Sequence, residues 1–234
     1  MENEDALGNI ENYFWIIDGA TDLYDSKKSI GYSVSEITHL LSEKLKVYCN
    51  EKESLKTIFQ NAIKEVRNII GLNDSNHEEY YKLPTFAFII ARLSRRKLEY
   101  LILGDCVMLV NDEQLTDHRV DRLFDLGKNE IENSKKGLNV LNKKEILQKI
   151  RGLANKEKGY WIGSLDDSSI EHALYGNLEV TGDNIVLMSD GFYDYYSQNN
   201  TKSFEELIAM RKQSTELDPI YGKKDDASIL VVEL

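Results

Sequence analysis

The sequence has 234 residues, of which 41% are hydrophobic and 29% are charged, a size and composition that suit one layered domain. The formal net charge of −11 is the opposite of the basic surface that binds nucleic acid. The acidic start MENEDALGN lacks the apolar core of a signal peptide, and no apolar run approaches the roughly 20 residues that cross a bilayer. We therefore expect a single cytoplasmic domain over 1–234 with no nucleic-acid or membrane partner; the oligomeric state stays open.

In chain order, the first half of the sequence reads as one strand followed by two helices. The stretch YFWIID at 13–18 has the continuous apolar character of a buried strand. Apolar residues then recur at helical spacing over 33–49 and again over 54–72. Ser54 is placed to cap the second of these helices and Gly71 to end it.

The second half of the sequence is dominated by strands. TFAFIIARL at 85–93 and KLEYLIL at 97–103 flank the polar turn SRR, which predicts a hairpin, and CVMLV at 106–110 is a further strand. A charged, helical pattern fills 119–158, and strands at 184–190 and 227–234 enclose a helix at 203–213. Because strands neighbour one another along the chain, this order favours an α+β fold with antiparallel sheets covered by helices.

Acidic residues gather where these strands end. Asp18-Gly19 follows the first strand, Asp190-Gly191 follows a later one, and Asp105 precedes the strand at 106–110. Carboxylates that converge repel one another unless a cation lies between them, and Mg²⁺ and Mn²⁺ prefer such oxygen ligands. Any single Asp-Gly pair is more often a hairpin turn. The residues after both pairs fit a hairpin poorly, however, and the pattern recurs.

Five motifs that occur in order give the sequence a family resemblance. NEDA (3–6), WIIDGATD (15–22), the hairpin at 85–110 with its Gly-Asp, IVLMSDGFYDYYS (185–197) and KDDASILVV (224–232) together resemble the metal-dependent Ser/Thr protein phosphatases of type 2C. The resemblance implies a four-layer αββα sandwich of two antiparallel sheets flanked by helix pairs. It also implies hydrolysis of a phosphorylated protein or peptide, with the insert at 119–158 near the rim of the site.

The same resemblance implies a binuclear Mn²⁺ or Mg²⁺ centre, with a looser third ion. Asp18 would bridge the two metals, and a metal-bridging hydroxide would attack phosphorus in line. The other ligands that it implies for the two metals are Glu4, the Gly19 carbonyl, Asp190 and Asp225. Asp105 would bind the third ion, and the acids that support these ligands would be Asp5, Asp194 and Asp226. Catalysis would thus depend on Asp18, Asp190 and Asp225 through a metal-activated water.

The sequence also departs from the family pattern. Many members carry a phosphate-binding Arg four residues before the acid that matches Glu4, a place that would precede Met1, and Ala20 stands where many have a His. We found no phosphate-binding Arg, and we expect a high Michaelis constant for small phosphoesters unless another cation replaces it. The candidates for that replacement are Lys27, Lys28, Arg119 and Arg122.

Two alternatives to an active protein phosphatase stay open. One is a catalytically weak family member that serves as a regulatory or binding module, and the other is a different two-metal phosphoester hydrolase, which the motif order disfavours. Cys49 and Cys106 form no disulfide framework, and we expect Cys106 to be a buried packing residue rather than a nucleophile. The four histidines show no ligand spacing (His39, His77, His118 and His172).

Overall fold

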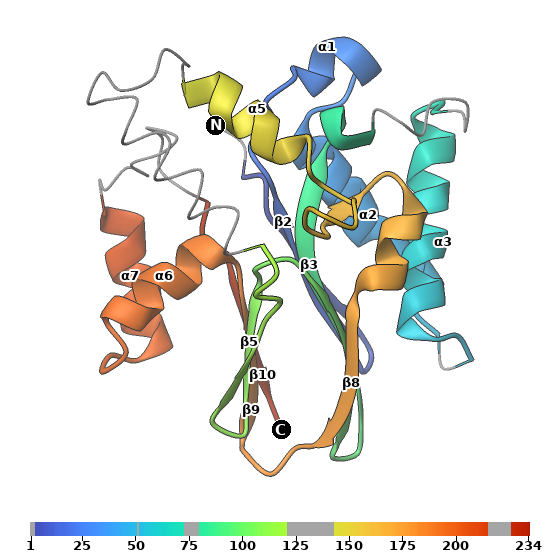
Figure 1. Ribbon diagram of the computed structural model, residues 1–234. Helices are drawn as coiled ribbons and strands as arrows, with labels where there is room; N and C mark the ends of the chain where they lie inside the picture. Colours follow the sequence, from blue (N-terminus) through green and yellow to red (C-terminus); the bar gives the residue numbers. More distant parts are fainter. Residues whose placement is uncertain (1–2, 51, 73–79, 121–142, 215–225) are drawn as a thin grey trace.

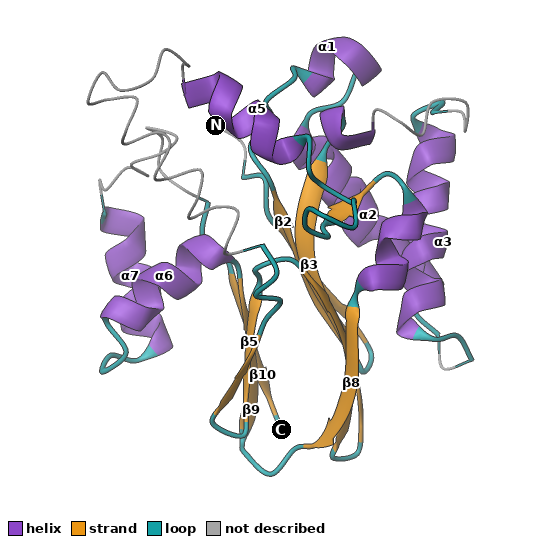
Figure 2. Cartoon of the chain, in the orientation of Figure 1, coloured by secondary structure: helices purple, strands orange, loops and turns teal. Residues whose placement is uncertain are grey.

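The computed structural model describes residues 3–50, 52–72, 80–120, 143–214 and 226–234. These residues form two sheets that pack face to face, with a helix pair on the outer face of each (Figures 1 and 2). The predicted α+β fold, a four-layer αββα sandwich of antiparallel sheets, is confirmed. None of the helices in the described ranges combines the length and apolar character that crossing a membrane requires.

The larger sheet has six strands and the smaller has four, and the named strands pair antiparallel throughout. The order of the larger sheet is β1 (Ala6–Ile10), β2 (Tyr13–Gly19), β3 (Thr85–Ser94), β4 (Lys97–Leu103) and β8 (Leu174–Glu179), with β7 (Gly163–Ser164) also paired to β3. The order of the smaller sheet is β10 (Ile229–Glu233), β9 (Asn184–Met188), β5 (Val107–Val110) and β6 (Glu113–Leu115).

Helices α2 (Val34–Tyr48) and α3 (Leu55–Ile69) cover the larger sheet, and α6 (Asp190–Gln198) and α7 (Phe204–Gln213) cover the smaller one. Serine caps begin three of these helices, because a hydroxyl satisfies a backbone N–H that the first turn leaves unpaired. Ser33 forms a capping box with Glu36, Ser203 forms another with Glu206, and Ser54 accepts from the N–H of Thr57. Three shorter elements complete the chain: α1 (Ser26–Ile30), α5 (Lys143–Arg151) and the 3₁₀ helix η2 (Asp167–His172).

Strand alternation sorts the core into layers and sets where each side chain points. In β2, Trp15 and Ile17 pack under α2 and α3, whereas Phe14 and Ile16 pack between the sheets. Asp18 continues the second series, so its carboxylate faces the space between the sheets at their end. The alternation of residues 13–18 therefore determines the direction in which the Asp18 side chain points.

Most predicted elements are confirmed within two residues of their limits, and the exceptions are instructive. The strand predicted to run to 190 ends at Met188, because a helix begins at Asp190 directly after Ser189. Strands β1 and β8 and helices α1 and α6 were not predicted. Of the insert at 119–158, helix α5 covers Lys143–Arg151, and 121–142 lies outside the described residues.

Candidate metal centre

The site is built where β2 of one sheet ends beside the start of α6, which follows β9 of the other. The backbone N–H of Asp190 donates to Oδ2 of Asp18 (3.3 Å), across 172 residues of sequence. Asp190 is the first residue of α6, and a carboxylate in the first turn interacts favourably with the helix dipole. The two predicted Asp-Gly acids are thus neighbours, and neither belongs to a hairpin.

A pair of hydrogen bonds joins the end of β9 to the segment before β10. The Ser189 N–H donates to the carbonyl of Ser228 (3.0 Å), and the Ser228 N–H donates to the hydroxyl of Ser189 (2.9 Å). Both serines are buried. These bonds hold the chain around Asp226 beside Asp190, and sequence reasoning missed both serines, although Ser189 stands directly before the Asp-Gly that drew notice.

The N-terminal segment lies over Gly19. The N–H of Glu4 donates to Oδ2 of Asp226 (2.8 Å), and the Thr38 hydroxyl donates to the Glu4 carbonyl (2.8 Å). A Cβ added at Gly19 would lie 2.6 Å from the carbonyl oxygen of Glu4 and 2.6 Å from Cγ1 of Val34. Only glycine therefore lets this segment approach β2 so closely, which brings Glu4 and Asp5 to the end of the strand.

Asp105 reaches the site because a glycine turns the chain before it. Gly104 has φ +85°, and a Cβ there would lie 2.6 Å from Cβ of Ala87. A larger residue would meet both backbone strain and a clash. The turn is held by the buried Asp117, which accepts from the Gly104 N–H (3.4 Å) and forms an ion pair with Arg119 (2.6 Å). No local sequence signal pointed to Asp117.

Burial and mutual repulsion raise the pKa values of the clustered acids. Burial, followed by the charges of Asp190, Asp5 and Asp105, raises the pKa of Asp18 well above its usual range. Burial and then the charge of Asp105 raise the pKa of Asp190 to about 7. A hydrogen bond between the two carboxyl groups raises the pKa of Asp18 and lowers that of Asp190. Burial and repulsion thus oppose ionisation of both carboxyl groups when no cation is bound.

Asp5 is the most deeply buried residue of the acidic cluster, with 3% of its surface exposed. Burial raises its pKa, while the nearby Ser228, Asp18 and Ser189 side chains lower it. Neither of its carboxylate oxygens has a partner at full hydrogen-bond geometry. An unpartnered buried carboxylate is costly unless positive charge lies nearby.

Cys106 lies near the same four acids. It is fully buried, and its thiol pKa is raised well above the usual value by burial and then by Asp18, Asp105, Asp5 and Asp190. A thiol in such surroundings stays protonated and makes a poor nucleophile. The expectation that Cys106 is a packing residue is confirmed.

The remaining predicted residues lie in several places. Asp194 is exposed on α6, where its charge contributes to the raised pKa of Asp190. Lys28 is exposed, Lys27 pairs with Glu36 (2.6 Å), and Arg119 is engaged by Asp117. His39, His118 and His172 are exposed, and Asp225, Arg122 and His77 lie outside the described residues.

The donor chemistry of this cluster fits a hard divalent cation. It offers carboxylate oxygens, an unpartnered buried carboxylate in Asp5, and a backbone at Gly19 without a side chain. Among the residues that the structure describes, no three His, Cys, Asp or Glu side chains are arranged so that they could hold a metal ion by themselves. That set does not include Asp225.

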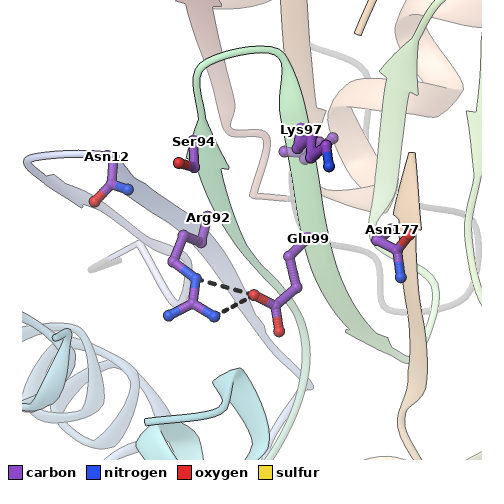
Figure 3. Close-up of a pocket in the computed structure, with 7 residues that line it drawn as sticks. Asn12, Arg92, Ser94, Lys97, Glu99 and Asn177 are labelled. Atoms are coloured by element: carbon purple, nitrogen blue, oxygen red, sulfur yellow. Dashed lines mark hydrogen bonds and ion pairs between the residues drawn. The ribbon is translucent and has the colours of Figure 1, made fainter. Parts of the chain in front are cut away.

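A pocket of about 330 Å³ lies at the other end of the larger sheet (Figure 3). It is lined by polar side chains around the β3–β4 hairpin, and Figure 3 shows Arg92 directed toward Glu99. The Arg92 guanidinium donates to the Glu99 carboxylate (2.9 Å), the Tyr13 hydroxyl (3.0 Å) and the Glu53 carbonyl (3.3 Å). Its charge is thus already compensated, and the pocket shares no residue with the acidic cluster.

Comparison with known proteins places this site in a family. The family model for protein phosphatase 2C matches residues 1–219, whereas no curated protein sequence matches the chain. Among solved structures, the chain is similar to a bacterial serine phosphatase, with 16% identity, a TM-score of 0.56, and coverage of 99% of this chain and 91% of the other. It is also similar to the serine/threonine phosphatase Stp1 from Staphylococcus aureus, with 17% identity and a TM-score of 0.56, and the match covers 100% of this chain and 90% of the other.

A further similar structure is the catalytic domain of the serine/threonine protein phosphatase PstP in complex with two manganese ions. It has 13% identity and a TM-score of 0.54, and the match covers 98% of this chain and 90% of the other. At such identities the solved structures support the fold, and the family model carries the assignment. The predictions of a type 2C phosphatase and of a protein-phosphatase enzyme are thereby confirmed: the chain belongs to the protein phosphatase 2C family.

Proposed function

We propose that this protein is a metal-dependent Ser/Thr phosphoprotein phosphatase that uses two Mn²⁺ or Mg²⁺ ions. The observation that carries the proposal is the group of Asp5, Asp18, Asp105 and Asp190, which come from three distant segments; burial and the charges of the other three acids raise the pKa of Asp18. A chain that had no use for cations would gain stability by losing such a cluster.

In this proposal Asp18 would serve both ions, Asp190 and Asp225 would hold one of them, and Glu4 with the Gly19 carbonyl would hold the other. Asp105, with Asp194 nearby, holds a weaker third ion. Asp5 and Asp226 support the ligands, and the bond from the Glu4 N–H to Asp226 supports this arrangement. When bound, the ions neutralise the phosphate and make a water molecule acidic enough to act as the nucleophile near neutral pH.

The protein's own groups have defined tasks in this scheme. Asp18 and Asp190 would hold the cations as carboxylates, the form that offers ligand oxygens. The buried serine pair keeps the two strand ends in register, and Asp117 with Arg119 keeps the turn at Asp105 in place. The buried, unreactive thiol of Cys106 is consistent with direct hydrolysis rather than a covalent cysteine intermediate.

The test is hydrolysis of p-nitrophenyl phosphate and of a phosphoserine peptide with Mn²⁺, Mg²⁺ or EDTA. We expect turnover with either ion, none with the chelator, and a loss of at least a hundredfold in Asp18→Asn. Equal rates in EDTA would refute the metal mechanism. Full metal binding without turnover on either substrate would instead support the alternative of a regulatory or binding module.

A further inference from the structure

A group of basic side chains lies beside the acidic site, although the protein as a whole is strongly acidic. The segment 143–158 contains six basic residues and two acidic ones, in a chain whose net charge is −11. It comprises α5 and the turns that follow it. A local excess of positive charge on an acidic protein marks a surface with its own electrostatic character.

Two of the nearby lysines converge on one aromatic ring. The ammonium of Lys156 lies 5.2 Å from the centroid of the Tyr81 ring, and that of Lys82 lies 5.8 Å from the same centroid. Lys156 also donates to the Gly152 carbonyl (2.6 Å), which limits where its ammonium can move. Both distances are within cation–π range. Two ammonium groups at one ring concentrate positive charge there, and that charge attracts anionic groups.

The Tyr81 ring packs against Tyr24, which lies five residues after Gly19 and bonds to α5. The rings of Tyr24 and Tyr81 meet edge to face, with centroids 6.0 Å apart. The Tyr24 hydroxyl donates to the carbonyl of Gln148 in α5 (3.1 Å), and the Gln148 side chain donates to the carbonyl of Leu23 (2.9 Å).

The last residue of helix α5 contacts the same loop. The buried Arg151 donates to the carbonyl of Thr21 (3.4 Å), only two residues after Gly19. Figure 1 shows α5 at the end of the molecule where β2 terminates. The lysine pair therefore lies on the rim of the site.

We propose that Tyr81, Lys82 and Lys156, here named the basic rim, bind acidic residues that flank the phosphorylated residue of the substrate. This inference rests on the proposed function and adds a substrate class to it, namely phosphoproteins with Asp or Glu near the phosphoserine or phosphothreonine. Such a segment would otherwise be repelled by a protein of net charge −11. Complementary charge at a rim acts mainly on association and specificity.

The test uses two fluorescent phosphoserine peptides that differ only in Asp against Asn at the flanking positions. Their affinities are measured by anisotropy at low salt, and their kcat/KM with Mn²⁺. We expect the wild type to prefer the acidic peptide by about tenfold, and 0.5 M salt to abolish this preference. Lys156→Glu, at an exposed position, should reverse the preference or remove it, and Lys82→Gln/Lys156→Gln should weaken it.

Lys212→Glu on α7, which packs on the other sheet, is the matched control and should retain the preference. Hydrolysis of p-nitrophenyl phosphate should be unchanged in all three variants. Equal affinity of the wild type for both peptides, or an unchanged preference in Lys156→Glu, would overturn the basic rim. Because anisotropy needs no turnover, an inactive protein would refute the proposed function while the binding ratio still decides this inference.

Discussion

Asp190→Asn should stabilise the metal-free protein at pH 8, although it removes a proposed metal ligand. Burial and the charge of Asp105 raise the pKa of Asp190 from 3.8 to about 7. The folded state therefore binds this proton more tightly than the unfolded state does. The free energy of unfolding should fall as the pH rises from about 4 to about 7, and then level off.

The magnitude follows from the shift. About three pKa units at 1.36 kcal/mol each give a cost of about 4 kcal/mol once Asp190 is ionised. The asparagine avoids this cost but loses about 0.5 kcal/mol of interaction with the N-terminus of α6. Asp18 and Asp105 still repel each other in the variant, so only part of the repulsion is removed. We therefore expect the free energy of unfolding to rise by about 2–3 kcal/mol at pH 8, and hardly at all at pH 4.

The assay is urea denaturation of both proteins in EDTA across pH 4–8. Asp194→Asn, an exposed change on the same helix, removes a smaller contribution to the pKa of Asp190 and should give a smaller gain, within about 0.5 kcal/mol of the wild type. With Mn²⁺ the order should reverse, because ligand binding then stabilises the wild type more. A variant that is less stable than the wild type at pH 8 in EDTA would refute the repulsion argument.

Three further predictions concern the parts that support the site. Gly104→Ala should cost about 2 kcal/mol or more of unfolding free energy in urea, because φ is +85° and Ala87 Cβ would lie 2.6 Å from the new atom; an unchanged midpoint would contradict this. Arg119→Ala should cost about 3 kcal/mol because it leaves the buried Asp117 unpaired, and Asp117→Asn in that background should recover part of the loss. Burial raises the pKa of Cys49 to about 12, so iodoacetamide at pH 8 should label this thiol slowly in the native protein and quickly in urea. Mass spectrometry can follow the labelling, and rapid labelling of the native protein would contradict the raised pKa.

The elements that could be predicted from the sequence are those whose local residue pattern matches the contacts that they make in the fold. The apolar run before Asp18 defines both a strand and the direction of its last side chain, and Ser54 marks the start of α3. Asp18 and Asp190 were likewise visible, because each follows an apolar stretch.

The missed elements depend on contacts between distant residues. Strand β1 contains Gly8 and Asn9, which are poor strand formers, yet it pairs with β2, and Trp15 packs over Gly8 where a Cβ would meet its ring at 2.3 Å. Helix α6 was missed because Asp190-Gly191 was interpreted as a loop, although a serine directly before an acid is a helix-start signal. The lysines around Tyr81 lie far apart in sequence, so no local pattern brings them together.

The most direct test of the account is a crystal structure of the wild-type protein with Mn²⁺, measured at the manganese absorption edge. We predict two anomalous peaks that both lie within ligand distance of Asp18, one of them also contacting Asp190 and Asp225. Soaked crystals with no anomalous peak at Asp18, or with manganese bound only elsewhere, would contradict the proposed metal centre.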